Sequence, residues 1–244
     1  MKYVGSKNRL SKDLAPIIQS YITDETEGYL EPFVGGANMI DKIKHDNKIG
    51  CDIHKQLIAL LKYVQDLDNE LPKTISEQEY NNVLNNKDNY DDWYVGLVGF
   101  CASFGAKYFG GYARAFKADK ITPRDMPSEA IRNIEKQRKD LVDITFKNYN
   151  FLELPKEKIK NYVIYCDIPY RSTIKYKTDS FPYDEFYKWA KEMSKNNTVL
   201  ISEYDMPDDF ECIWQKETKC TIDSNKVSGD KNNNRVEKLF KVKQ

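Results

Sequence analysis

Four consecutive residues, Asp167, Ile168, Pro169 and Tyr170, have types and a spacing that could do chemistry on an amino group. They follow an apolar run, 162–166, that is typical of a buried strand. We therefore expect them at the carboxyl end of a strand, where open α/β sheets bind their ligands. There the carboxylate and a backbone carbonyl could accept hydrogen bonds from an exocyclic amino group, while the tyrosine stacks on the ring that carries it.

A glycine turn far upstream is the second signal. The run 28–33 predicts a short strand, and Gly35 and Gly36 follow it, where the lack of a side chain lets the backbone approach a ligand closely. Asp52 ends the next predicted strand, and a carboxylate there could accept hydrogen bonds from both hydroxyls of a ribose. The alternatives are an ordinary tight turn and a solvated aspartate that caps the following helix.

The elements that must position these residues alternate between strands and helices. Strands are predicted over 28–33, 48–53, 144–146, 162–166, 198–202, 210–214 and 239–242. Helices are predicted over 9–22, 37–43, 57–67, 76–84, 128–141 and 183–193. From 68 to 143 the pattern is helical and loop-like, without a convincing pair of strands. The sequence therefore predicts an α/β fold with a mostly parallel sheet, interrupted by one helical insertion.

The bulk composition is that of a globular chain with a balanced charge. Of 244 residues, 40% are hydrophobic and 31% are charged, and 38 basic residues match 38 acidic ones. A protein that binds duplex nucleic acid is more often basic overall, so this balance argues mildly against that class. The distribution is uneven, however, because five basic residues and a single acid lie between 107 and 124.

Cysteine usage indicates a reducing compartment. The five cysteines are odd in number and widely scattered, and no pair has the close spacing of a zinc site. We expect free thiols, no metal and a cytoplasmic location, with no signal peptide and no membrane-spanning segment. His45 and His54 lie in polar stretches of sequence, which favours a surface position for both.

Four motifs stand in order along the chain: Tyr3-Val4-Gly5-Ser6-Lys7, Glu31-Pro32-Phe33-Val34-Gly35-Gly36, Asp52 and Asp167-Ile168-Pro169-Tyr170. In this order they resemble the Dam-like (alpha-group) DNA adenine N6-methyltransferases, over nearly the whole chain. The resemblance implies a catalytic domain over 1–67 and 144–244, which has a Rossmann-like methyltransferase sheet and binds S-adenosylmethionine. It also implies an inserted helical target-recognition domain that binds DNA, over 68–143.

The resemblance implies a role for each matching residue. The cofactor, S-adenosylmethionine, would be bound by Tyr3, Lys7, Glu31, Pro32, Phe33, Gly35, Gly36, Asp52, Asn150, Phe151 and Asp167. The reaction would be carried by Asp167, Ile168, Pro169 and Tyr170, with the target adenine flipped out of the duplex. Double-stranded DNA would be contacted by Lys107, Tyr108, Tyr112, Arg114, Lys117 and Arg124. The run 100–114 resembles the segment with which the family grips its target.

Three positions depart from the family pattern. Ser6 replaces a second glycine, Ile168 replaces the first of two prolines, and Asn150 replaces an aspartate. Two rival functions stay open: an amino-methylating enzyme that acts on RNA, cytosine or a protein amide, and a catalytically inactive DNA-binding module that keeps the fold. The basic and aromatic residues of 100–114 could also form a core aromatic stripe with solvated lysines. The DNA recognition sequence, an accompanying restriction endonuclease and a monomeric or weakly dimeric state stay open as well.

Overall fold

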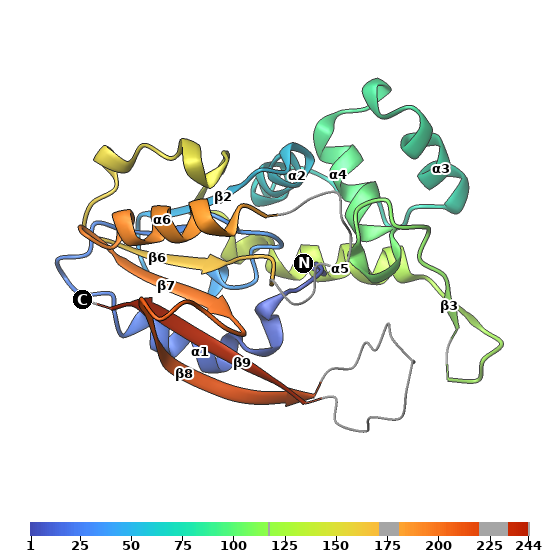
Figure 1. The fold of residues 1–244 in the computed structure, drawn as a ribbon. Coiled ribbons are helices and arrows are strands. Elements are labelled where there is room, and N and C mark those ends of the chain that lie inside the picture. Colours follow the sequence, from blue (N-terminus) through green and yellow to red (C-terminus); the bar gives the residue numbers. More distant parts are fainter. Residues whose placement is uncertain (117, 171–180, 220–233, 244) are drawn as a thin grey trace. The chain divides into compact units, whose positions relative to one another are not determined.

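The computed structural model describes residues 1–116, 118–170, 181–219 and 234–243 (Figure 1). The fold is mixed α/β, and its seven-stranded sheet has the order β5-β2-β1-β6-β7-β9-β8. The chain divides into two compact units, Met1–Ser20 with Leu30–Leu154 and Tyr21–Tyr29 with Pro155–Gln244. The prediction of an α/β fold with a mostly parallel sheet is confirmed.

The first unit holds the predicted glycine turn and the whole segment 68–143. Its helices are η1 (Lys7–Arg9), α1 (Ser11–Gln19), η2 (Ile40–Lys42), α2 (Lys55–Gln65), α3 (Glu77–Asn85), η3 (Lys87–Asn89), α4 (Asp92–Cys101), η4 (Phe104–Ala106), α5 (Met126–Gln137), η5 (Arg138–Asp140) and η6 (Phe151–Glu153). Its strands are the end of β1 (Gly28–Glu31), with β2 (Lys48–Asp52), β3 (Ala115–Phe116), β4 (Pro123–Arg124) and β5 (Ile144–Asn148). Strands β2 and β5 pair in parallel. A separate recognition domain over 68–143 stays a prediction.

Helices α2 and α4 pack directly on one another. Helix α2 buries Leu57, Leu60 and Leu61 at helical spacing. On the facing helix, a side chain at Gly96 would put its Cβ only 2.2 Å from the backbone oxygen of Gln56. The glycine therefore allows the two helices to approach closely, and the contact packs the segment 68–143 against a helix that precedes it in the sequence.

The second unit holds the later strands of the chain. It contains η7 (Lys156–Lys158), β6 (Tyr162–Asp167), α6 (Tyr183–Met193), β7 (Thr198–Glu203), β8 (Phe210–Lys219) and β9 (Asn234–Val242). Strands β6 and β7 are parallel, whereas β9 runs antiparallel to both β7 and β8. Parallel pairing puts the carboxyl ends of β6 and β7 at the same edge, where Asp167 lies opposite Ser202.

Two of the local predictions were wrong. The helix predicted over 37–43 is only the three-residue η2, because Gly35 and Ala37 both have positive φ, +49° and +55°, and so cannot begin a right-handed helix. The segment 68–143 is not free of paired strands, because β3 and β4 form a two-residue antiparallel pair. Such short strands leave too little alternation in the sequence to be recognised.

No helix within the described ranges has the length and apolar character that crossing a membrane requires. Among the same residues, no group of three or more histidine, cysteine or acidic side chains could hold a metal ion. Cys51, Cys101 and Cys166 are buried free thiols, and Cys212 is an exposed one. Burial raises the pKa of both Cys51 and Cys101 to about 12, so neither is a nucleophile near neutral pH.

Candidate functional site

The turn after β1 is built so closely that both of its glycines are required. A Cβ at Gly35 would lie 2.9 Å from a ring carbon of Tyr3, and a Cβ at Gly36 would lie 2.7 Å from the Asn38 amide nitrogen. Gly35 also has a φ of +49°, which L side chains rarely adopt. The structure therefore brings Tyr3 against the glycine turn, two parts of the predicted cofactor site that are far apart in the sequence.

Asp52, at the end of β2, is tied to the same turn. Its Oδ2 accepts a hydrogen bond from the backbone N–H of Gly35 at 3.2 Å, and its Oδ1 accepts one from the N–H of His54 at 2.9 Å. Burial raises the pKa of this carboxyl, because it disfavours the charge, while the backbone N–H donors act in the opposite direction. The backbone N–H of Ile53 is a third such donor, so the carboxylate keeps about one lone pair for a further donor.

An exposed apolar side chain stands next to this acid. Ile53 is 71% exposed, although it directly follows a buried strand. The Asn148 side chain fixes the backbone there by donating to the carbonyl oxygens of Asp52 and Ile53, at 2.9 Å each. An exposed apolar side chain could pack against a flat ring, and the neighbouring carboxylate could accept a hydrogen bond from a sugar hydroxyl. The pair therefore suits a ligand in which a flat ring is attached to a sugar. The sequence analysis did not identify Ile53, although an isoleucine after a strand-ending acid was a possible signal.

Phe33 and Phe151 also come together, with ring centroids 5.4 Å apart. Asn150, just before Phe151, uses its side-chain oxygen to accept from the N–H of Leu152 at 3.1 Å. The Glu153 carboxylate accepts from the N–H of Asn150 in return, which completes a capping box for η6. Asn150 therefore has a structural role, and one lone pair of its side-chain oxygen is already used.

Three further residues predicted to bind the cofactor are buried. Lys7 is only 7% exposed, which is unusual for a lysine, and Glu31 is 2% exposed. Pro32, between Glu31 and the turn, is buried as well. The burial of a charged residue, Glu31, at the end of β1 indicates that this position is more than a surface turn.

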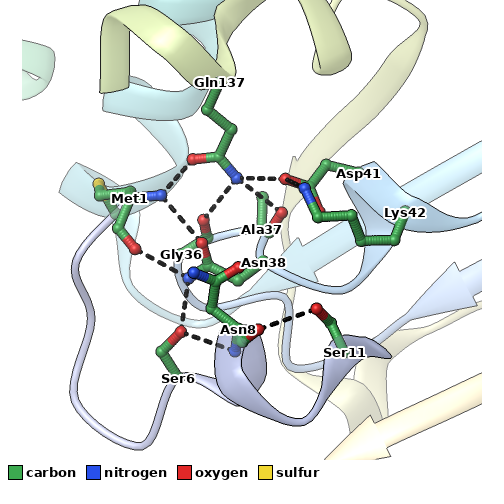
Figure 2. Close-up of polar contacts among 10 residues, drawn as sticks. All are labelled: Met1, Ser6, Asn8, Ser11, Gly36, Ala37, Asn38, Asp41, Lys42 and Gln137. Carbon is green, nitrogen blue, oxygen red and sulfur yellow. Dashed lines mark hydrogen bonds and ion pairs between the residues drawn. The ribbon is translucent and has the colours of Figure 1, made fainter. Parts of the chain in front are cut away.

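A glutamine from α5 clamps the glycine turn (Figure 2). The Gln137 amide nitrogen donates to the carbonyl oxygen of Ala37 and to the carboxylate of Asp41, both at 2.9 Å, and lies 3.3 Å from the oxygen of Gly36. Gln137 is buried and is separated from the turn by a hundred residues in sequence. Sequence reasoning missed it, because nothing in a helical pattern indicates a contact at that separation.

The other side of the same network holds the first residues of the chain. Figure 2 shows the amino group of Met1 donating to the Asn38 oxygen, at 2.9 Å, and to the oxygen of Gln137. The Asn38 amide nitrogen in turn donates to the Met1 carbonyl and to the Ser6 hydroxyl, at 2.9 Å each. Burial lowers the pKa of the Met1 amino group to about 6. These bonds hold the first residues of the chain, which include Tyr3, beside the turn.

In the second unit, the predicted catalytic corner lies at the carboxyl end of β6. Asp167 is the last residue of the strand and is half-buried, whereas Ile168 is fully buried. The carbonyl oxygen of Pro169 accepts a hydrogen bond from the hydroxyl of Tyr183 at 2.7 Å, which fixes the backbone after the acid. The four residues thus lie at the end of a strand, as the apolar run before them predicts.

The ring of Tyr170 is enclosed rather than exposed. It is 8% exposed and meets the ring of Tyr204 edge to face, with centroids 4.4 Å apart. Its hydroxyl donates to the Glu237 carboxylate at 2.7 Å. The pKa of Tyr170 is raised well above 10, first because it is buried and then because the carboxylates of Asp167 and Glu237 lie close by. Its hydroxyl therefore keeps its proton throughout the neutral range.

The residues predicted to bind DNA are spread over several environments. Arg114 forms a two-pronged ion pair with Glu77, and Arg124 forms one with Glu129. Lys107 is exposed, and Lys117 lies outside the described residues. Near the short β3–β4 pair, Phe116 and Ile121 are strongly exposed.

Tyr108 and Tyr112 instead fit the alternative of a core aromatic stripe. Tyr108 packs edge-on against His54, with centroids 4.3 Å apart, and also contacts Phe100 and Phe109. The Tyr112 hydroxyl donates to a buried backbone oxygen, that of Ile75, at 2.8 Å. The expectation that His54 lies at the surface was wrong: it is half-buried between rings, and burial lowers its pKa.

The comparison with protein families gives one match. Residues 3–95 match the family described as D12 class N6 adenine-specific DNA methyltransferase. This confirms the predicted resemblance, and the family is one of enzymes. The matched segment contains Tyr3, Lys7, the glycine turn and Asp52, and it ends well before Asp167. A search of curated proteins found no match.

Proposed function

We propose that the protein is a site-specific DNA methyltransferase that moves a methyl group from S-adenosylmethionine to N6 of adenine in double-stranded DNA. The observation that carries the proposal is the family match over residues 3–95, which includes a glycine turn too tight for any side chain and an acid bonded to it. The corner at Asp167 supports it, because an acid, a backbone carbonyl and an aromatic ring are held at one strand end.

The first unit would hold the cofactor. A ribose hydroxyl would donate to the Asp52 carboxylate, and the adenine ring would lie on Ile53 and near Phe33 and Phe151. Lys7 would neutralise the methionine carboxylate, and the backbone of Gly35 would approach the ligand where no Cβ can stand. When bound, the cofactor supplies a methyl group made electrophilic by its positively charged sulfur.

The second unit would hold the target amino group. An adenine amino group is a poor nucleophile, because its lone pair is delocalised into the ring. Hydrogen bonds from its two N–H groups to the Asp167 carboxylate and the Ile168 carbonyl would favour a more tetrahedral nitrogen, whose lone pair is free to attack. The N6–methyl bond would form as the sulfur–methyl bond breaks, and one amino proton would leave to water. The rate would come from positioning and electrostatics.

The duplex would be contacted by the segment 68–143. Exposed Lys107, Arg114 and Arg124 could reach phosphates, provided that the two arginines exchange Glu77 and Glu129 for DNA. A base inside a duplex must be flipped out before its amino group can react. A cytoplasmic location follows from this substrate and cofactor.

Transfer of tritiated methyl groups to duplex DNA that lacks methyladenine is the direct test, followed by identification of the labelled base. We expect label on adenine, and Asp167→Ala should lower turnover by roughly three orders of magnitude or more. Asp208→Ala, an exposed acid in the same unit, is the matched control.

The rival functions predict different results. Label that appears in RNA, in cytosine or in protein, but not in adenine, would support another amino-methylating enzyme. Protein that retards DNA in a gel but transfers no label, with or without Asp167, would be an inactive DNA-binding module. Sequencing the modified bases of the treated DNA would give the recognition sequence as well.

A further inference from the structure

Glu237, on β9, contacts the corner that follows β6. Its carboxylate accepts the Tyr170 hydroxyl at 2.7 Å and lies 3.4 Å from the Tyr204 hydroxyl. The Arg235 guanidinium donates to that same Tyr204 hydroxyl at 3.3 Å and lies over the Tyr204 ring. Two tyrosines, one acid and one base thus form a connected polar and aromatic cluster in which one member belongs to the proposed catalytic corner.

The strand pairing explains why β9 reaches this corner. Parallel pairing of β6 with β7 places Asp167 opposite Ser202, so the residues after each strand leave the sheet at one edge. The antiparallel strand β9 pairs Lys238 with Glu203, the last residue of β7. Glu237 directly precedes Lys238, and Tyr204 directly follows Glu203, so the antiparallel pairing brings Glu237 beside Tyr204. Tyr170 lies at the same edge of the sheet.

The contacts fix the plane of the Tyr170 ring from both ends. Its backbone follows Pro169, whose carbonyl oxygen is held by the Tyr183 hydroxyl. Its hydroxyl is held by a carboxylate, a hydrogen bond of the stronger, charge-assisted kind. The edge-to-face contact with Tyr204 opposes rotation of the ring between these two points.

We propose that Glu237 is a positioning residue for the reaction, which holds the Tyr170 ring in the plane on which the target base stacks. This rests on the proposed function, because only a flipped base needs that plane. Glu237 does not touch the reacting atoms, so it acts through Tyr170. Tyr204 and Arg235 keep the Glu237 carboxylate directed at the Tyr170 hydroxyl.

Steady-state methyl transfer tests the role. Glu237→Leu and Tyr170→Phe should each lower kcat by about tenfold to a hundredfold, while the affinity for S-adenosylhomocysteine, measured by calorimetry, stays within about twofold of the wild-type value, since Glu237 acts only through Tyr170. Glu237→Gln keeps an acceptor oxygen and should recover most of the loss. The double variant should be no worse than the poorer single variant, because both changes remove one hydrogen bond. Glu217→Gln, an exposed acid on β8, is the control and should leave kcat unchanged.

A second measurement follows Tyr170 directly and needs no activity. In protein labelled with 3-fluorotyrosine, the ¹⁹F signal that disappears in Tyr170→Phe should shift or broaden in Glu237→Leu and stay in place in Glu217→Gln. A Tyr170 signal that is the same in Glu237→Leu as in the wild-type protein overturns the inference. A signal that shifts in Glu237→Leu while kcat stays unchanged overturns it as well. Losses of kcat and of cofactor affinity in parallel, without recovery in Glu237→Gln, would mean that Glu237 only stabilises the fold, which also overturns it.

A failure of the proposed function can be told apart from a failure of this inference. If the wild-type protein transfers no methyl group to adenine while the Tyr170 signal still depends on Glu237, the proposed function is wrong. The reaction role of Glu237 then falls with it, and only the hydrogen bond remains.

Discussion

Asp52 supports the fold of the glycine turn and is also proposed to bind the cofactor. Its two oxygens accept hydrogen bonds from the backbone N–H groups of Gly35 and His54, and these bonds hold the carboxylate against the turn. Burial nevertheless disfavours its charge, which raises its pKa. The folded chain therefore bears an electrostatic cost at this residue, and a ligand that donates hydrogen bonds to the ionised carboxylate would offset that cost.

This gives opposite pH trends for stability and for cofactor binding. Because the pKa of Asp52 is raised in the folded chain, its contribution to the free energy of unfolding is present below its ordinary pKa and is lost as the pH rises through the folded value. Cofactor binding needs the ionised form, so the affinity should fall as the pH drops through that same raised pKa. Calorimetry with S-adenosylhomocysteine from pH 4.5 to 8 measures the affinity.

Asp52→Asn supplies the variant that isolates this effect. An amide offers one acceptor oxygen instead of two, so the affinity at pH 7.5 should fall by about tenfold or more, equivalent to about one lost hydrogen bond to a charged group. The remaining affinity should not depend on the pH in the range in which Asp52 titrates. Asp46→Asn, an exposed acid in the same unit, should behave like the wild-type protein. A wild-type affinity that stays flat down to pH 4.5 would count against the assigned role of Asp52.

At the scale of elements, the sequence predicted what depends on near neighbours. The strand that ends at Asp167 and the helix α2 follow from short periodic patterns, and both are present. The helix predicted over 37–43 failed, because a left-handed turn at Gly35 and Ala37 overrides its apolar spacing.

Contacts between distant segments could not be predicted in the same way. Gln137 is 100 residues away in sequence from Ala37, whose carbonyl it contacts. Glu237 is 67 residues away from Tyr170, whose hydroxyl it accepts. A single sequence carries no signal for such pairs, because their proximity results from how the elements pack. The motifs of the proposed site therefore follow from the sequence, whereas the contacts that Gln137 and Glu237 make do not.

The α5 helix should stabilise the glycine turn through Gln137. Gln137→Leu fills a similar volume but leaves the Ala37 carbonyl and the Asp41 carboxylate without this donor. We expect a loss of about 1–3 kcal/mol in the free energy of unfolding, the usual cost of a buried unsatisfied polar group, together with weaker binding of S-adenosylhomocysteine. Denaturant unfolding and calorimetry measure the two quantities. Asn133→Leu, on the exposed face of α5, is the matched amide-to-leucine control, and equal effects in both variants would refute a specific clamp.

At the scale of the whole molecule, the zero net charge and the proposed polyanionic substrate need to be reconciled. The described basic side chains of 107–124 are partly neutralised in place, because Arg114 pairs with Glu77 and Arg124 pairs with Glu129. All four partners are at least partly exposed, so these ion pairs contribute little to stability and are readily exchanged for phosphate. The acids would thus weaken binding to DNA of any sequence.

Removing the two acids should strengthen DNA binding. In the double variant Glu77→Gln and Glu129→Gln, both arginines are free to contact phosphates, so the affinity for duplex DNA should rise, and the salt dependence of log K should steepen by about 0.9 for each arginine that gains a phosphate. Fluorescence anisotropy over a series of salt concentrations measures both quantities. The double variant Glu157→Gln and Glu185→Gln makes the same change in net charge at exposed sites of the second unit. If both double variants gain affinity equally, net charge alone explains the effect, and Arg114 and Arg124 do not contact DNA.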